Sequence, residues 1–208
     1  MEQEKNDTEA ERPKQDKTKE EIAVVLDFLP NGYPYDDRPM YMKNAVAQAV
    51  GREHFILLEL VPKKGIHLQP FEEVYIGEGK RDKIRFIRGQ LEYRDLTSMA
   101  KNMLPEMVEK LVRKNEQRFV EFFNKGTIVT PRMHQFQLLP GVGKKHMMDI
   151  LDERSKKPFI SFTEISERVK LFPDPVKTIV RRVLQELEGE EKYYLFAMRQ
   201  RKMEMGRF

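Results

Sequence analysis

Residues 83–112 read KIRFIRGQLEYRDLTSMAKNMLPEMVEKLV, and the spacing of apolar residues changes within this stretch. Up to Arg88, apolar and basic residues alternate with a period of two, which predicts a strand with one buried and one basic face. From Leu96 to Val112, apolar residues recur at the i, i+3, i+4 and i+7 spacing of one helical face. The chain is therefore predicted to be α+β, with its strands first and its helices second.

Further short apolar runs precede this point. Residues 22–29 (IAVVLDFL) and 55–61 (FILLELV) are each closed by a proline and a glycine, and both are predicted strands. Residues 74–77 (VYIG) and the alternating segment at residues 83–88 flank the polar turn at residues 78–81, which predicts a β-hairpin. We assign Phe55 and Phe86 to the core. Four or more strands within about 70 residues indicate a small antiparallel barrel or a strongly bent sheet.

The apolar stripe that begins at Leu96 leads into a connecting helical region over residues 95–126. Pro105 lies inside the stripe, so a kink or a new helix start is expected there. The methionines of the stripe fit core packing better than a peptide-binding groove. Gly126 is expected to end this helical region.

The rest of the chain is also predicted to be helical, with start and stop signals in chain order. Thr130-Pro131 is predicted to open a short helix through Leu138, and a second helix is predicted over residues 144–154. The capping pair Ser161 and Glu164 opens a third helix, and Asp174-Pro175 opens a last helix that ends at Gly189.

The first 21 residues differ in composition from the rest. They hold eight acidic and five basic residues, and only Met1 and Ala10 are apolar. Such a segment cannot bury enough surface to offset its ordering entropy, so residues 1–21 are predicted to be a disordered acidic leader. The remaining residues carry a net charge of +7, against +4 for the whole chain, which favours a polyanionic partner.

The chain has no cysteine, which excludes a disulfide framework, a thiolate zinc site, an iron–sulfur cluster and a cysteine nucleophile. The N-terminus lacks the apolar region of a signal peptide, and no apolar run approaches the roughly 18 residues of a membrane span. We expect a cytoplasmic protein with no membrane partner.

No pattern of a catalytic or metal site is found in the sequence. The four histidines are not paired at a metal-ligand spacing, and there is no HExxH, Ser-His-Asp or P-loop arrangement. Paired carboxylates such as Glu72-Glu73 lie in charge-rich surroundings that are typical of solvated faces. We therefore expect no enzyme, no cofactor and no metal.

The segment Leu139-Pro140-Gly141-Val142-Gly143-Lys144-Lys145 carries the clearest chemical signal. Two glycines permit unusual backbone angles and a close approach of a ligand to the backbone. Main-chain N–H groups at the start of the following helix favour an anion, and the two lysines add positive charge. The segment resembles the helix-hairpin-helix motif, which implies that Gly141, Val142, Gly143, Lys144 and Lys145 grip a backbone phosphate without reading a base. The alternative is a plain turn between two helices.

The next pair of helices, at residues 162–169 and 175–187, lies where tandem versions of the motif have a second hairpin. Its connection, Phe172-Pro173-Asp174-Pro175, contains no glycine, and Asp174 would repel phosphate unless it caps the helix. We expect this unit to be structural. A likeness of Pro173-Asp174 to the catalytic loop of helix-hairpin-helix DNA glycosylases is disfavoured, because the chain has no room for a base pocket.

The order of segments is similar to that of an archaeal domain-of-unknown-function family, number 655, whose members are labelled putative RNA-binding proteins. The resembling stretches are the acidic leader, residues 50–84 and residues 138–169 (LLPGVGKKHMMDILDERSKKPFISFTEISERV). The resemblance implies an OB-like β-barrel domain over residues 22–94 and a helix-hairpin-helix domain over residues 127–191. It implies no established activity.

An OB-like barrel would bind single strands through aromatic side chains and basic loops. Tyr33 and Tyr35 flank Pro34 in a turn and are expected to be exposed, while Asp36 and Asp37 either repel a phosphate strand or hold Arg38. The candidate residues on the barrel are Tyr33, Tyr35, Tyr41, Arg38, Lys63, Lys64, Lys80, Arg81, Lys83, Arg85 and Arg88.

Residues 192–208 form a basic C-terminal segment, in which the aromatic run at residues 193–196 is expected to dock on the domain; a frayed end is the alternative.

Three functions remain open. The first is a monomer that binds RNA as part of the translation or ribosome-assembly machinery, with ribosomal or translation components as partners. The second is a DNA-binding accessory module, because phosphate contacts do not detect the 2′-hydroxyl. The third is a protein–protein adaptor with no nucleic-acid role.

Overall fold

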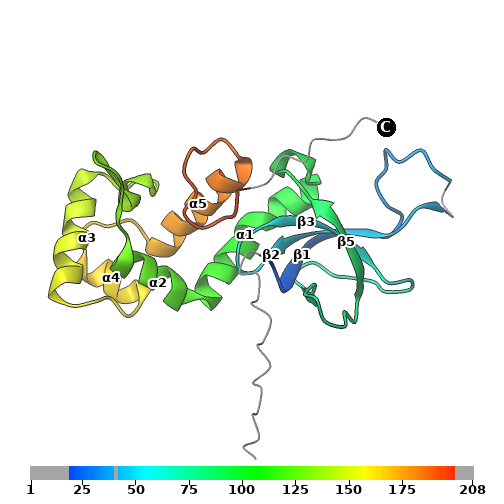
Figure 1. Cartoon of the computed structure of the whole chain (residues 1–208), viewed down its shortest axis with the longest axis horizontal. Helices are drawn as coiled ribbons and strands as arrows, with labels where there is room; N and C mark the ends of the chain where they lie inside the picture. Colours follow the sequence, from blue (N-terminus) through cyan, green and yellow to red (C-terminus); the bar gives the residue numbers. More distant parts are fainter. Residues whose placement is uncertain (1–18, 40–41, 200–208) are drawn as a thin grey trace, which may run out of the picture.

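A computed structural model describes residues 19–39 and 42–199 of the protein. Its first half is a curled five-stranded antiparallel sheet, and its second half is mainly helical (Figure 1). The α+β class and the order of strands before helices are therefore as predicted. The strands are β1 (Ile22–Leu29), β2 (Val46–Gly51), β3 (Leu57–Pro62), β4 (Glu73–Tyr75) and β5 (Ile84–Gln90), arranged in the order β4-β1-β2-β3-β5.

The predicted hairpin between β4 and β5 is wrong. β4 pairs with β1, where Val74 lies opposite Ala23, and β5 pairs with β3, so the two strands lie at opposite edges of the sheet. The polar segment between them therefore connects one edge strand of the sheet to the other. β2, which pairs with both β1 and β3, was not predicted.

A β-bulge explains why the assignment of Phe86 to the core is wrong. Val61 lies opposite Phe86 and Pro62 opposite Ile84, so Arg85 is an extra residue in the strand. Such a residue shifts the alternation of side chains. Ile84 is buried, whereas Phe86 is 39% exposed. Phe55, by contrast, is 1% exposed, as predicted.

The sheet is followed by five α-helices and a small second sheet within the described residues. α1 continues through Pro105 and does not restart there, and Gly126 ends α2 as predicted. The elements are η2 (Tyr93–Asp95), α1 (Ser98–Lys114), α2 (Glu116–Lys125), β6 (Ile128–Thr130), β7 (Met133–His134), the 3-10 helix η3 (Gln135–Leu138), α3 (Lys144–Lys156), α4 (Phe162–Arg168) and α5 (Pro175–Glu188).

The short helix predicted to open at Thr130-Pro131 is wrong. Thr130 ends β6 and pairs with Met133 of β7, so Pro131 lies in a tight hairpin turn. Proline fits such a turn because its ring fixes φ and no N–H is needed there. The chain becomes helical only at η3, a single 3-10 turn.

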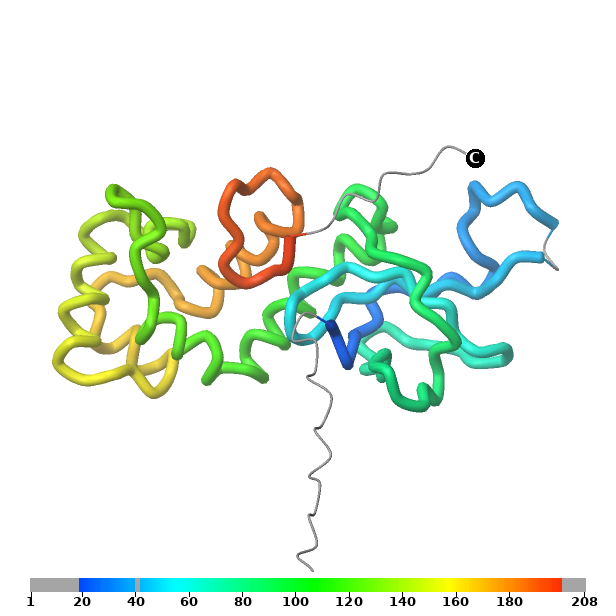
Figure 2. Tube along the Cα trace, viewed as in Figure 1, coloured from blue at the N-terminus to red at the C-terminus, as the bar shows by residue number. Residues whose placement is uncertain are grey.

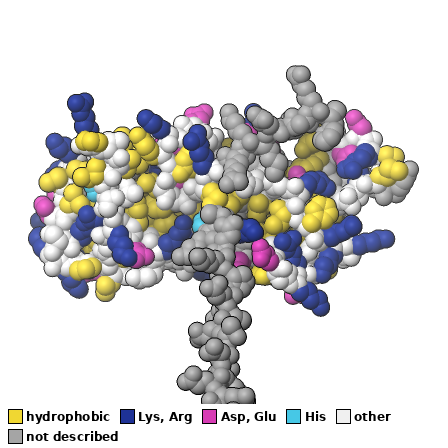
Figure 3. All heavy atoms as spheres, in the orientation of Figure 1, with side chains coloured by type: hydrophobic (Ala, Val, Ile, Leu, Met, Phe, Trp, Pro, Cys, Tyr) yellow, Lys and Arg dark blue, Asp and Glu magenta, His cyan; other side chains and the backbone are white. Residues whose placement is uncertain are grey.

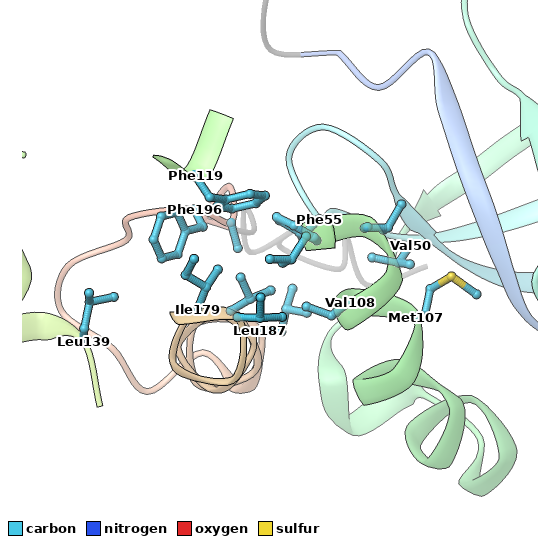
Figure 4. Close-up of a cluster of buried hydrophobic side chains, with 14 of the residues drawn as sticks. Val50, Phe55, Met107, Val108, Phe119, Leu139, Ile179, Leu187 and Phe196 are labelled. Atoms are coloured by element: carbon cyan, nitrogen blue, oxygen red, sulfur yellow. The ribbon is translucent and has the colours of Figure 1, made fainter. Parts of the chain in front are cut away.

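One buried apolar cluster joins the sheet to the helices (Figure 4). It contains Phe55 beside the sheet, Val108 of α1, Phe119 of α2, Ile179 of α5 and Phe196 of the C-terminal segment. A second cluster, which includes Val25, Leu60 and Ile84, fills the other side of the sheet. The sheet is therefore covered on both faces, and α1 is the element that connects its packing to that of the helices.

Residues 19–21, which were predicted to belong to the disordered leader, are part of the fold. Residues 1–18 lie outside the described residues, but Glu20 is 7% exposed and its carboxylate accepts N–H hydrogen bonds from Glu53 (2.8 Å) and His54 (2.6 Å). Burial raises the pKa of Glu20, against the lowering effect of these backbone donors. Residues 19–21 are thus ordered and continue into β1.

The C-terminal segment docks as expected and connects the two halves. The buried carboxylate of Glu186 accepts the N–H groups of Leu195, Phe196 and Ala197, and Met198 donates its N–H to the carbonyl of His54 (2.9 Å). Figure 2 shows this red segment between the helices and the sheet. The basic residues beyond Arg199 lie outside the described part of the chain.

No helix in the described ranges is long and apolar enough to cross a membrane.

Candidate nucleic-acid interface

The turn before α3 leaves the N-terminus of that helix open. Gly143 is its N-cap and carries no side chain, and the first helical hydrogen bond runs from the Met147 N–H to the Gly143 carbonyl (3.0 Å). The earlier N–H groups of a helix have no intrahelical acceptor. Lys144 and Lys145 follow directly and are exposed. In the part of the chain that the structure describes, neither lysine lies within 4.0 Å of a carboxylate.

The two glycines of this turn have different roles. Gly141 has φ of +81°, a left-handed conformation that a β-substituted residue adopts only with strain. Gly143 has φ of −84° and no atom within 4 Å of the place its Cβ would occupy, so neither angle nor space in the protein requires a glycine there. Val142 is buried between them and anchors the turn in the core.

α5 shows what an occupied helix N-terminus looks like in the same fold. The carboxylate of Asp174 accepts the N–H groups of Val176 (2.9 Å) and Lys177 (3.1 Å). The prediction that Asp174 caps this helix is therefore confirmed. The amides that an anion would need at α5 are already taken.

Beside the α3 turn lies a shallow hollow that is lined by Gly141, Gly143, Arg182, Gln185 and Glu191, among others. The guanidinium of Arg182 is paired with Glu186 (2.8 Å) and Glu191 (3.0 Å). This arginine therefore belongs to the packing of α5, and the positive charge of the turn comes from its lysines.

A second group of basic residues lies at the end of the sheet, in the loops that follow β3 and β4. The Lys63 N–H donates to the Lys83 carbonyl (2.8 Å), which holds the two loops together. Lys83 is paired with Glu72, while Lys64 and Lys80 are exposed. The predicted residues that meet here, which we call the basic loops, are Lys63, Lys64, Lys80, Arg81 and Lys83. Arg85 lies beyond them on β5, with its guanidinium 5.8 Å from the ring of Phe86.

The tyrosines of the β1–β2 loop divide into one anchored and one exposed ring. Tyr33 is half-buried, because its hydroxyl donates to Glu59 (3.1 Å) and accepts from Gln48 (3.1 Å), so its predicted exposure is wrong. Burial raises the pKa of the Tyr33 hydroxyl. Tyr35 is 76% exposed and stacks on Tyr33 with ring centroids 5.0 Å apart.

Arg38 forms an ion pair with Asp36, which was one of the two alternatives expected for the acidic residues of this loop. Its guanidinium lies 2.7 Å from Asp36, and this pairing holds the pKa of Asp36 at about 2. Tyr41 lies outside the described residues.

Comparison with known proteins places these features in a family. A family model described as "Protein of unknown function (DUF655)" matches residues 19–198. This chain belongs to the DUF655 family. It is 41% identical over 195 residues to the uncharacterized protein MJ0038 of Methanocaldococcus jannaschii. That alignment covers 92% of this chain and 87% of MJ0038. The crystal structure of Af1531 from Archaeoglobus fulgidus is 45% identical in sequence and superimposes with a TM-score of 0.80. The superposition covers 86% of this chain and 100% of the Af1531 chain.

The sequence of this DUF655 protein did not reveal a polar network on the sheet face next to α1. Glu59 pairs with Arg88 and accepts from Tyr33, and Gln48 accepts the N–H of Thr97, the N-cap of α1 (2.8 Å). The alternation of β2 and β3 was the available signal, because Gln48 and Glu59 are polar residues inside apolar strands. The network fixes Tyr33, and through it the ring of Tyr35.

The candidate residues of the DUF655 fold form two separate surfaces. α3 lies at one end of the molecule and the sheet at the other (Figure 1), and Lys and Arg side chains stand out at the sheet end in Figure 3. Among the described residues, no three His, Asp or Glu side chains are grouped so that they could hold a metal ion. The arrangement is suited to anions at both ends.

Proposed function

We propose that this DUF655 protein binds nucleic acid, with RNA as the preferred partner, by holding a backbone phosphate at the N-terminus of α3. The observation that carries the proposal is the open, uncapped start of α3 beside Gly141, Gly143 and two exposed lysines. Unoccupied N–H groups and the helix dipole favour an anion at this place. Gly143 supports the same reading, because a residue without a side chain leaves room for a phosphate to approach.

The turn retains the anion-binding half of a helix-hairpin-helix motif. The preceding helix is reduced to η3, but the phosphate contact depends on the turn and on the helix that follows it. We regard the motif as a shortened version, in which β6, β7 and η3 take the place of the first helix.

The sheet supplies the second contact surface of the proposal. In OB-folds, the loops between strands 1 and 2 and between strands 4 and 5 bind oligonucleotides. Here Tyr35 and Arg38 lie in the β1–β2 loop, and Lys80 and Arg81 lie between β4 and β5. β4 and β5 are not paired, so this barrel is open on one side in the described residues.

RNA is preferred because the exposed ring of Tyr35 suits an unstacked base. Sequence-specific RNA recognition mostly targets single-stranded loops and bulges, whose bases stack on aromatic side chains. The two surfaces lie at opposite ends of the molecule, so one ligand that contacts both must span its long axis. A folded RNA, such as a ribosomal segment, can do so. A DNA module and a protein adaptor are the competing functions.

The test is the affinity of Lys144→Ala/Lys145→Ala for RNA as a function of salt. The slope of log affinity against log salt is negative, and each lost phosphate contact should make it shallower by about 0.7 on single strands. Binding to all sequences should weaken alike, because phosphate contacts carry no sequence information.

Gly143→Ala separates the phosphate contact from charge. Its φ of −84° suits alanine, so folding should change by no more than about 1 kcal/mol, while the new methyl group should weaken RNA binding. Gly141→Ala is the contrasting variant, because its positive φ predicts a loss of stability as well.

Parallel titrations with DNA of the same sequence distinguish the competing functions. If the protein binds RNA and DNA with equal affinity, the result supports a DNA-binding module as well as it supports an RNA-binding protein. If the wild-type protein binds neither, or if its binding is independent of salt, the nucleic-acid function is refuted and the adaptor reading gains support.

A further inference from the structure

Leu171 has a backbone conformation that the packing of its own side chain does not explain. Among the described residues, three residues other than glycine have a positive φ: Phe55 (+53°), Phe71 (+69°) and Leu171 (+58°). For a bulky residue this conformation is a genuine outlier. Phe55 is 1% exposed, and Phe71 packs on the core with the ammonium of Lys110 3.8 Å from its ring centroid. Leu171 is 86% exposed, so burial does not compensate for its strain.

The turn that contains Leu171 would accept better residues. The Phe172 N–H donates to the Val169 carbonyl (3.2 Å), so Leu171 is the third residue of a four-residue turn. A positive φ at this position favours glycine or asparagine. Leucine there costs stability and exposes an apolar side chain. Backbone strain at a residue whose own side chain makes no compensating contact is an indicator of a functional residue.

This turn packs against the start of α3. The ring of Phe172 lies 5.9 Å from that of His146, in the first turn of α3, and Pro173 Cγ lies 3.6 Å from the place a Cβ on Gly141 would occupy. Leu171 is therefore one residue away from a contact with the proposed phosphate site. Lys170 beside it is exposed, and across the described ranges neither Lys170 nor Lys144 lies within 4.0 Å of a carboxylate.

The surroundings of Leu171 indicate what would cover its side chain. The positive charges of Lys144, Lys145 and Lys170 nearby favour a polyanionic ligand over a protein surface with few acidic residues. A nucleic acid offers phosphates and apolar base faces side by side, and apolar side chains are known to enter between bases as wedges. A base next to the bound phosphate would bury the leucine while the lysines remain near the backbone.

We propose that Leu171 is an apolar wedge that packs against a base of the RNA strand whose phosphate is held by α3. The inference rests on the proposed function and adds its substrate class: structured RNA with a weakly stacked step, such as a bulge, next to the bound phosphate. Bulged bases are the cheapest to displace and are common targets of RNA-binding proteins. The α5 terminus takes no part, because Asp174 occupies its amides.

The experiment uses the full chain and an RNA hairpin with a single-nucleotide bulge, in which 2-aminopurine stands next to the bulge and reports unstacking by fluorescence. Leu171→Ala should weaken binding by about tenfold and abolish the fluorescence increase, with an unchanged salt slope, because the lost contact is apolar. Leu171→Asn should have the same effect on binding and also raise Tm, because asparagine tolerates a positive φ. Ile160→Ala is the matched control, since Ile160 is 66% exposed but follows the far end of α3.

The outcomes separate this inference from the proposed function. If Leu171→Ala binds and unstacks the RNA like wild type while Lys144→Ala/Lys145→Ala binds weakly, the wedge is refuted and the phosphate site stands. If Ile160→Ala weakens binding as much as Leu171→Ala, the effect is not specific to the turn and the wedge is refuted too. If the wild-type protein does not bind the hairpin or its single-stranded and DNA counterparts, both proposals fail.

Discussion

Gly51 and Glu20 illustrate how a single position can depend on a distant one. A Cβ built on Gly51 would lie 2.0 Å from Glu20 Oε1, so only glycine at the end of β2 leaves room for the carboxylate. The carboxylate in turn accepts two N–H groups in the turn after β2. Residues 19–21 are thus fixed by a site that the composition of the leader does not reveal.

The raised pKa of Glu20 predicts a pH-dependent contribution to stability. Because burial raises its folded-state pKa above the ordinary glutamate value, the folded protein binds the proton more tightly than the unfolded chain. This contribution is fully present below the ordinary pKa and is lost as pH rises through the raised one. We expect the free energy of unfolding of wild type, minus that of Glu20→Gln, to fall as pH rises above the ordinary glutamate pKa, as measured by urea denaturation. A difference that rises with pH would mean that the backbone donors outweigh burial.

Residue exposure was predictable where the local pattern was regular. Phe55 and most of the apolar stripe of α1 were assigned correctly, because helical spacing and a continuous apolar run need no tertiary information. Met99, which the stripe placed in the core, is 55% exposed, so its assignment is wrong. Phe86 was not, because the bulge at Arg85 cannot be seen in the alternation itself. Tyr33 was not, because its partners, Gln48 and Glu59, are brought to it by strand pairing.

At the scale of elements, the contrast between α3 and α5 gives a prediction. Asp174→Ala should lower the free energy of unfolding by about 1 kcal/mol, because two N–H groups at the start of α5 lose their acceptor. RNA binding should be unchanged, since this helix start is not part of the proposed site. Thermal denaturation and RNA titration of the same variant test both statements. Tighter RNA binding would contradict the assignment, because it would show that removing the carboxylate opens a second phosphate site.

The helices were predictable and the sheet topology was not. α3, α4 and α5 begin and end close to their predicted residues, because caps such as Ser161, Asp174 and Gly189 act within a few residues. β2 reads VAQAVG, and alanine has little strand preference, so only its pairing on both sides makes it a strand. Thr130-Pro131 is a signal shared by helix starts and turns, and tertiary pairing with Met133 decides between them.

At the scale of the molecule, the two proposed anion-binding surfaces depend on one continuous core. The buried cluster that includes Phe55, Val108, Phe119, Ile179 and Phe196 contains residues from the sheet side and from the helices alike. The division into a barrel over residues 22–94 and a helical domain over residues 127–191 remains a prediction about how these parts fold. Because the two parts share one core, we expect them to unfold together. In the folded protein the same packing would hold the two surfaces at a fixed separation for a long ligand.

Phe196→Ala tests this cooperation. The Phe196 ring is 6% exposed and lies with its centroid 4.9 Å from that of Phe122 and 5.4 Å from that of Phe119, so its removal should cost about 3–5 kcal/mol. Because the same segment bonds to the His54 carbonyl between β2 and β3, amides of β2 and β3 should lose hydrogen-exchange protection together with those of α2 and α5. Measured by mass spectrometry, an equal loss of protection in both halves would indicate one cooperative unit. Protection that persists in the sheet while the helices exchange would show that the barrel is an independent domain, and the separation of the two surfaces would then be set by α1 alone.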